Sequence, residues 1–185
     1  MMGQLSTKRS RKTATSIEAA QLSHVPAVFL MLHGAAQEGF FSSWLFQPRT
    51  QYRLLLMLIS VVLFGRAFPA VREKHSARLR VAIHDGVVIG HTILLSYAKR
   101  MEIFTCAVRS DFRRTGVGRM LVGDAVNLAG ELSIHAACMP KSHGMCMLLR
   151  KAGFVEEGRF LPGKWANVVL RHWQRGNAQL EKLSA

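Results

Sequence analysis

One dipeptide, Asp85-Gly86, constrains the fold of this chain most, because it separates two apolar runs that are rich in β-forming residues. These runs are RLRVAIH over 78–84 and VVIGHTILLSY over 87–97. A two-residue Asp-Gly linker between such runs is typical of a β-hairpin, since glycine accepts the positive φ that a type I′ turn needs. A third run, EIFTCAV over 102–108, follows after a short turn. We therefore expect an antiparallel meander of three strands in the middle of the chain.

Helical periodicity and further β-rich runs surround this meander. Apolar residues recur at helical spacing before it and directly after it, and β-rich runs alternate with a helix toward the C-terminus. In chain order we expect helices over 25–38 and 50–65, the three strands, a helix of about 15 residues that includes Val117 and Leu128, a strand over 132–139, a helix over 142–152, and strands over 154–160 and 165–173. This order predicts an α/β fold of the α+β type, with a mixed, mostly antiparallel central sheet flanked by helices.

The chain has 185 residues, which is the size of a single domain. We expect one folded domain over residues 25–175, followed by a C-terminal tail over 176–185. Residues 1–17 contain no acidic residue and are rich in serine, threonine and basic residues. This composition is typical of disordered segments, so we expect a basic tail over residues 1–24.

The charge of the chain indicates the kind of partner that it would attract. Lysine and arginine number 25 against 11 aspartate and glutamate residues, which gives a formal net charge of +14. Such an excess favours nucleic acid, a membrane surface or a phosphorylated small molecule without choosing among them. The apolar run 54–65 has twelve residues, whereas a spanning helix needs about twenty. We therefore expect a buried helix there and no membrane partner.

Cysteine and histidine patterns argue against a metal site. The three cysteines are Cys106, Cys138 and Cys146, and no C-x-x-C pair occurs. An odd number without that pairing is typical neither of a disulfide framework nor of a zinc site. The histidines of the predicted strands, His84, His91 and His135, are isolated from one another, and we expect them to be partly buried structural residues. We expect reduced thiols in a cytoplasmic protein that holds no metal.

The segment DFRRTGVGRML over 111–121 lies where the third strand ends and a helix begins. At such a point the first N–H groups of the helix lack intrahelical partners and the helix dipole is positive, so that a phosphate is attracted. Two glycines would allow close approach of the backbone, and three arginines would supply charged donors. These residues are Gly116, Gly118, Arg113, Arg114 and Arg119. Neither the Gly-Lys-Ser/Thr of a Walker loop nor the third glycine of a dinucleotide fingerprint is present, so the segment predicts a pyrophosphate site of another kind.

Three segments resemble a known family. Arg113-Arg114-Thr115-Gly116-Val117-Gly118 resembles the Arg/Gln-x-x-Gly-x-Gly/Ala motif of the GNAT N-acetyltransferase superfamily. CAV over 106–108 is similar to the strand end that precedes this motif, and LLRKAGF over 148–154 is similar to the later LYEKLGF segment. The resemblance covers residues 76–173.

This resemblance implies acetyl-CoA as the donor. The backbone from Arg114 to Arg119 would bind its pyrophosphate, and the strand end at Val108 would bind its pantetheine arm. In the family the strands splay near this point to admit the thioester. The implied donor-binding residues are Cys106, Val108, Arg113, Arg114, Thr115, Gly116, Val117, Gly118 and Arg119.

Direct transfer of an acetyl group to an amine requires a base for the amine proton and an acid for the leaving thiolate. Glu102 is the candidate base, because its strand is similar to the glutamate-bearing strand of the histone acetyltransferase branch. It lies six residues before Val108, so period-two alternation predicts that the two side chains share one face.

The candidate acid is less clearly defined by the sequence. The family's acid is a tyrosine in the LYEKLGF segment, where this chain has Leu149. Ser142, at the position of a family asparagine, and Tyr97, on the preceding strand, are the candidates that could replace it. His143 and Cys146 are further alternatives on or near the same helix.

Two classes of function remain open at this point. The first is an N-acetyltransferase that uses acetyl-CoA and acts as a monomer or homodimer on a small amine, a protein lysine or N-terminus, or an aminoacyl-tRNA. The second is a non-catalytic module on the same scaffold that binds RNA or the ribosome, or that binds CoA for regulation. The basic cluster KRSRK over 8–12 and the charge of +14 favour an RNA or another anionic macromolecule as partner, and Leu149 favours a regulatory role.

Overall fold

The structure is a computed structural model, and it describes residues 14–41, 47–68, 74–139, 142–160 and 170–175. The helices are α1 (Val25–Gln37), α2 (Pro48–Phe64), α3 (Val117–Ala129) and α4 (His143–Lys151), with 3₁₀ turns η1 (Leu22–His24) and η3 (Ser110–Phe112). The strands are β1 (Ser16–Ala19), β2 (Ser76–His84), β3 (Val87–Ser96), β4 (Arg100–Val108), β5 (Ser133–Cys138), β6 (Val155–Phe160) and β7 (Leu170–Arg175). The turn expected before the last strand, and residues 165–169 of that strand, lie outside the described residues.

The strands form one mixed sheet in the order β1-β2-β3-β4-β5-β7-β6. β4 and β5 are parallel, and the other neighbours are antiparallel. The parallel pair follows from the chain path, because α3 crosses from the end of β4 to the start of β5. The predicted α/β fold with a mixed, mostly antiparallel sheet is therefore confirmed.

The hairpin that the Asp-Gly pair predicts joins β2 to β3. Asp85 has a φ of 51° and Gly86 a φ of 75°, so both central residues are left-handed, as a type I′ turn requires. β4 then begins at Arg100, two residues before the predicted start. The connecting turn is closed by the Tyr97 N–H, which donates to the Arg100 carbonyl at 2.8 Å.

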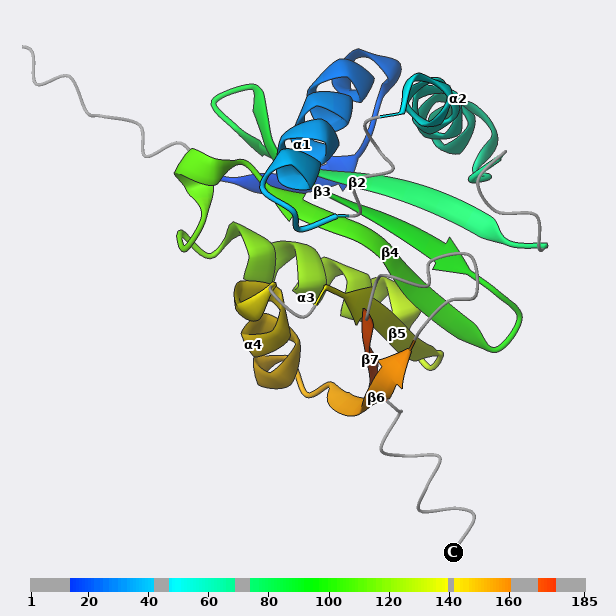
Figure 1. The fold of residues 1–185 in the computed structure, drawn as a ribbon, viewed down its shortest axis with the longest axis vertical. Helices are drawn as coiled ribbons and strands as arrows, with labels where there is room; N and C mark the ends of the chain where they lie inside the picture. The colour runs from blue at the N-terminus through cyan, green and yellow to red at the C-terminus, as the bar shows by residue number, and fades with distance from the viewer. Residues whose placement is uncertain (1–13, 42–46, 69–73, 140–141, 161–169, 176–185) are drawn as a thin grey trace, which may run out of the picture.

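Two helical layers cover the sheet (Figure 1). α1 and α2 lie on one face, where Leu32 and Leu58 pack in one core with Ile93 of β3. α3 and α4 lie on the other face, where Val122 and Leu149 pack in a second core. The face covered by α1 and α2 is called the α1/α2 face below, and the opposite one the α3/α4 face.

The first strand lies within the expected N-terminal tail. Ser16–Ala19 form β1, which pairs with residues 80–83 of β2, and the Ala20 N–H donates to the Leu79 carbonyl at 2.8 Å. The expectation of a disordered segment is therefore wrong for residues 14–24, and residues 1–13 lie outside the described residues. A four-residue edge strand is too short to show period-two alternation, and so its sequence gave no strand signal.

One titratable side chain is fully buried in the α1/α2 face. His91 on β3 is 0% exposed, and neither ring nitrogen has a hydrogen-bond partner. Burial lowers the pKa of His91 to about 3. The sequence predicts a structural histidine, and a buried neutral imidazole agrees with that interpretation.

Replacing His91 with leucine is expected to raise the stability of the protein in acid. In the folded state the His91 pKa is about 3, whereas an unfolded histidine has a pKa near 6.5. Below pH 6.5 the unfolded state therefore binds a proton that the folded state does not, and stability falls as the pH drops toward 3. At pH 4.5 the loss is about 2 to 3 kcal/mol, which His91→Leu removes. Urea denaturation at pH 7.5 and pH 4.5 checks this, and equal pH dependence in both proteins would contradict it.

Candidate functional site

β4 and β5 diverge along their length. Their last pair joins Ile103 to Ala136, whereas β4 continues to Val108. Among the described strands, none pairs with the β5 side of residues 104–108. The two parallel strands therefore leave a splayed opening beside the second half of β4.

The backbone of β4 presents hydrogen-bonding groups to this opening. The Arg109 N–H donates to the Ile89 carbonyl of β3 at 2.9 Å. Because strand residues alternate in the direction of their backbone groups, those of Cys106 and Val108 point away from β3 and toward the opening. Two of the residues expected to bind the pantetheine arm thus carry peptide groups in a suitable direction for a ligand.

The loop from β4 to α3 has an unusual backbone. Arg114 has a φ of 67° and Gly116 a φ of 98°. The hydroxyl of Thr115, between them, donates to the Phe112 carbonyl at 2.7 Å. Left-handed residues separated in this way turn successive N–H groups toward one side, which is the geometry of an anion-binding nest.

Helix α3 begins directly after this loop. Met120 donates its N–H to the Gly116 carbonyl at 3.1 Å, so the N–H groups of Val117, Gly118 and Arg119 precede the first intrahelical bond. These groups, together with the positive end of the helix dipole, can bind a phosphate. The segment predicted to hold a pyrophosphate therefore has the expected strand, loop and helix around it.

Glycine is favoured at the two positions of the motif for different structural reasons. At Gly116 the positive φ requires glycine, and a Cβ would meet nothing within 4 Å. At Gly118 a Cβ would lie 3.2 Å from Leu148 Cδ2 and 3.9 Å from Val108 Cγ2. Gly118 thus lets α3 approach α4 and β4, a packing reason that the sequence did not reveal.

Arg113 makes contacts that the sequence does not predict. Its two terminal nitrogens bind the carboxylate of Glu38, with 3.0 Å between Nη2 and Oε1, and its Nε donates to the Val108 carbonyl at 3.3 Å. Its guanidinium also lies over the ring of Phe40 at 5.2 Å. In this structure the donors of Arg113 are directed to protein groups, so its role as a donor to the anion stays a prediction. Arg113 connects the loop to the C-terminal end of α1.

Arg114 and Arg119 remain as the charged donors of the loop. Both are exposed, and neither has an ion pair with any residue in the described part of the chain. Asp111 is paired with Arg109 at 2.7 Å, and this hydrogen bond holds the pKa of Asp111 below its usual range. The acid nearest in sequence is therefore neutralised by its own arginine.

A β-bulge in β4 changes the face on which Glu102 lies. Ile93 pairs with Thr105, but the next residue of β3, Leu94, pairs with Ile103, so Phe104 is an extra residue. Consequently Ile103 and Cys106 pack in the same core although they are three residues apart. The prediction that Glu102 and Val108 share a face is wrong, because period-two counting does not hold across a bulge.

Glu102 therefore lies on the α1/α2 face, while Cys106 and Val108 face α3. On β3 it pairs with Leu95, and on β5 it pairs with His135. Tyr97, the first residue after the end of β3, packs against the same core as Leu95. The structure thus brings Glu102, Tyr97 and His135 together on one face, immediately before the splayed opening.

The other acid candidates lie across the opening, at the start of α4. Ser142 is the N-cap of α4 and is 8% exposed, and its hydroxyl makes no capping bond to the helix. Cys146 is buried one turn later, with its sulfur 3.3 Å from that of Cys138. His143 is exposed, and Leu149 is 0% exposed within the α3/α4 core. The structure does not bring Ser142 and Tyr97 together, because they lie on opposite faces of the sheet.

Burial also decides the chemistry available to the cysteine of β4. It raises the pKa of the Cys106 thiol, which is therefore protonated at neutral pH. A protonated thiol is a poor nucleophile, so the arrangement favours direct transfer between bound groups over a covalent intermediate on Cys106.

The described ranges contain no group of three or more histidine, cysteine, aspartate or glutamate residues that could hold a metal ion. In the same residues no helix is long and apolar enough to cross a membrane.

Three features of this region were missed from the sequence. Glu38 is the partner of Arg113, but a helix-end glutamate 75 residues away carries no local signal for that contact. His135 lies beside Glu102 only because of the register between β4 and β5, which the sequence does not specify. Gly90 allows α3 to dock, since a Cβ there would lie 3.0 Å from Leu121 Cδ1, and a glycine inside a predicted strand is the one local signal that could have indicated a close approach.

Comparison with known proteins agrees with this geometry. The family model of the acetyltransferase (GNAT) family matches residues 37–154. Among solved structures, yncA from Salmonella typhimurium, with its cofactor acetyl-CoA, has a TM-score of 0.64 at 17% identity over 89% of this chain and 94% of its own. Ribosomal-protein-alanine N-acetyltransferase from Brucella melitensis has a TM-score of 0.66 at 19% identity over 88% and 99%. The paia N-acetyltransferase from Thermoplasma acidophilum, in complex with coenzyme A, has a TM-score of 0.64 at 14% identity over 88% and 99%.

At these identities the solved structures establish a shared fold. No curated protein sequence matches this chain.

Proposed function

Since this chain belongs to the acetyltransferase (GNAT) family, we propose that it transfers the acetyl group of acetyl-CoA to a primary amine by direct attack on the thioester. The observation that carries this proposal is the splayed opening between β4 and β5, with the anion-binding start of α3 at its end. Acetyl-CoA carries a diphosphate next to an extended pantetheine arm, and so it requires an anion site beside an open strand edge.

The donor is held by this chain's backbone more than by its side chains. The N–H groups from Arg114 to Arg119 bind the pyrophosphate, and the charges of Arg114 and Arg119 assist them. The peptide groups of Cys106 and the Val108 N–H bind the arm along the open edge of β4, since the Val108 carbonyl already accepts from Arg113. The residues present fit this ligand, because both sets of groups point away from the sheet's own pairing.

Glu102 accepts the proton of the attacking amine. The nitrogen forms a bond to the acetyl carbon as the bond from that carbon to sulfur breaks. The α1/α2 face, on which Glu102 lies, is therefore the side from which the amine enters. Tyr97, on the same face, orients the amine and does not reach the leaving sulfur.

Ser142 relays a proton from solvent to the leaving thiolate: its hydroxyl donates to the sulfur as it receives a proton from water, since Leu149 has no proton to give. It stands at the N-terminus of α4, where the positive end of the helix dipole also stabilises a negative sulfur. Cys146 is the alternative donor, one turn further into the helix.

The acceptor that this chain's charge favours is an amine on an anionic macromolecule, such as an RNA-bound or ribosome-bound partner. A formal charge of +14 would repel polyamines and attract nucleic acid. We place the reaction in the cytoplasm, because the three cysteines are free and reduced thiols are typical of that compartment.

An acceptor screen with labelled acetyl-CoA tests the proposed function. Small amines, lysine peptides, N-terminal peptides and aminoacyl-tRNA are each offered, and CoA release and label transfer are followed together. Label on an amine-bearing acceptor supports the proposal. CoA-binding without transfer to any acceptor class, and without slow hydrolysis, would favour the regulatory alternative.

The Glu38–Arg113 pair gives a prediction about donor affinity. Replacing Glu38 with glutamine is expected to weaken acetyl-CoA binding about fivefold, because the loop that presents Arg114 loses its anchor to α1. Isothermal titration measures the Kd, and Glu131→Gln, at an exposed position beyond α3, is the matched control. An unchanged Kd in Glu38→Gln would show that the ion pair has no part in donor binding.

A further inference from the structure

Helix α2 is apolar on the side that faces away from the protein. Its inner side, with Met57, Leu58 and Val61, belongs to the α1/α2 core. Its outer side exposes large side chains, and Phe68 follows just beyond it. Their exposed fractions are 64% for Tyr52, 37% for Leu55 and Leu56, 52% for Leu63, 72% for Phe64 and 64% for Phe68. A patch of this kind on a folded domain is typical of a binding surface.

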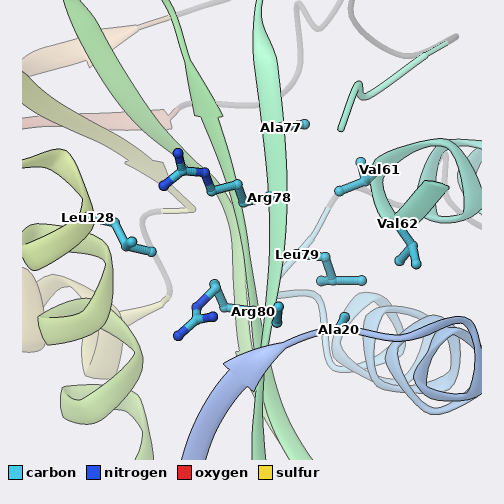
Figure 2. A pocket seen from close by; sticks show the side chains of 9 residues that line it. Ala20, Val61, Val62, Ala77, Arg78, Leu79, Arg80 and Leu128 are labelled. Atoms are coloured by element: carbon cyan, nitrogen blue, oxygen red, sulfur yellow. The ribbon is translucent and has the colours of Figure 1, made fainter. Parts of the chain in front are cut away.

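The position of α2 leaves this side open. α2 packs on α1, η1 and β2, at the rim of the helical layer (Figure 1). Beside it, at the edge of β2, is a hollow of about 260 Å³ with Val61, Val62 and Leu79 on its α2 side (Figure 2). The Arg78 and Arg80 side chains point to the opposite side of the sheet in that view. The hollow thus spans the edge of the sheet, and the side of it that borders α2 is apolar.

Arginines accompany the apolar side chains. Arg49 and Arg53 are exposed in the first two turns of α2, and Arg66 is exposed just after its end. The helix contains no aspartate or glutamate. Because the helix dipole disfavours cations in the first turn, Arg49 is placed against the local electrostatics of the helix. An external anion would compensate this placement.

The combination of charge and apolar surface decides among partners. A second copy in a symmetric dimer would bring the arginines of one α2 against those of the other, with no acid on this helix to pair them. Nucleic acid supplies phosphates but no apolar phase to cover Leu63, Phe64 and Phe68. An anionic lipid bilayer supplies both, with phosphates at the level of the arginines and acyl chains below them.

We propose that the outer face of α2 docks this protein on an anionic lipid membrane. The apolar side chains of α2 enter the interface, and Arg49, Arg53 and Arg66 bind the lipid phosphates. The sequence-based expectation of no membrane partner was based on the length that a spanning helix needs. In the proposed docking, α2 does not span the bilayer but lies in the plane of the membrane interface. The docking surface is the outer side of α2, whereas the donor loop precedes α3 on the opposite face of the sheet (Figure 1).

Co-sedimentation of the full chain with vesicles tests the proposal. One set of vesicles consists of phosphatidylcholine alone, and the other consists of phosphatidylcholine and phosphatidylglycerol in equal amounts. We expect binding to the anionic vesicles only, weakened by salt. The double variant Leu63→Ser/Phe64→Ser is expected to lose this binding, while Met147→Ser, at an exposed apolar residue of α4, keeps it.

A second pair of variants tests how much the arginines of α2 contribute to binding of the anionic vesicles. Arg49→Gln/Arg53→Gln is expected to lower the affinity for anionic vesicles about 25-fold, at about fivefold for each charge. Lys99→Gln/Lys151→Gln removes the same charge at exposed sites outside α2 and is expected to have a smaller effect. Equal losses in the two double variants would overturn the assignment to α2. Circular dichroism confirms that each variant is folded.

Two further results would also overturn the proposal. The first is absence of binding to both kinds of vesicle. The second is a dimer, detected by light scattering, that Leu63→Ser/Phe64→Ser breaks and that does not bind vesicles, which would assign the surface to self-association. Since none of these measurements uses acetyl transfer, they can fail without any consequence for the proposed function.

Discussion

Replacing Gly116 with aspartate is expected to abolish the response of this protein to acetyl-CoA. The wild-type protein should gain roughly 5 to 10 °C in Tm at a donor concentration of about 100 times Kd. In Gly116→Asp a carboxylate stands among the N–H groups at the start of α3, where the donor's pyrophosphate would lie. Like charges so close cost several kcal/mol, so kcat/KM for acetyl-CoA should fall about 100-fold or more. Thermal shift and steady-state kinetics measure the two effects.

Gly116→Asn is the matched control for this variant. Asparagine has nearly the shape of aspartate and meets the same φ of 98°, so both variants carry the same backbone strain of about 1 kcal/mol. No atom lies within 4 Å of the added Cβ, so neither variant is expected to misfold. Asparagine should keep most of the donor-induced rise in Tm. If the two variants behaved alike, the loss would come from the backbone, and a phosphate at this loop would not be supported.

Glu102→Gln is expected to lower kcat by about 10²-fold or more, while acetyl-CoA binds as before. Glutamine keeps the size of the side chain and cannot accept the proton of the amine. Steady-state kinetics with a saturating acceptor measures kcat, and isothermal titration measures the Kd for acetyl-CoA.

Two variants serve as controls for this prediction. Glu131→Gln removes an exposed carboxylate beyond α3 and should leave kcat unchanged. His135→Ala removes the residue that pairs with Glu102 across β4 and β5, and it tests whether the effect extends to that neighbour. A Glu102→Gln enzyme with a wild-type kcat would refute the role of this glutamate as base.

The local signals of the sequence were sufficient for the strands and helices around the donor site. The hairpin at Asp85-Gly86 was predictable because a two-residue turn leaves few conformations open. The order of strand, loop and helix around Gly116 was predictable because the periodicity changes there from two to 3.6. In contrast, β1 gave no signal, since a four-residue edge strand is defined by its pairing with β2 and not by its own pattern.

The candidate site shows the limit of such signals more clearly. Counting by twos from Val108 placed Glu102 on the wrong face, because one extra residue, Phe104, reverses the alternation. Arg113 is predicted to bind an anion, and in this structure its guanidinium binds Glu38, which lies 75 residues away in the chain.

By itself, the sequence determined which segments form strands and helices and where a phosphate can meet the start of a helix, because these properties depend on neighbours within one or two turns. The tertiary structure alone decided on which face the catalytic candidates lie, where β4 and β5 part, and which arginines stay free for a ligand. Those properties depend on register and on contacts between distant segments, and a change of one residue in register exchanges the two faces of a sheet.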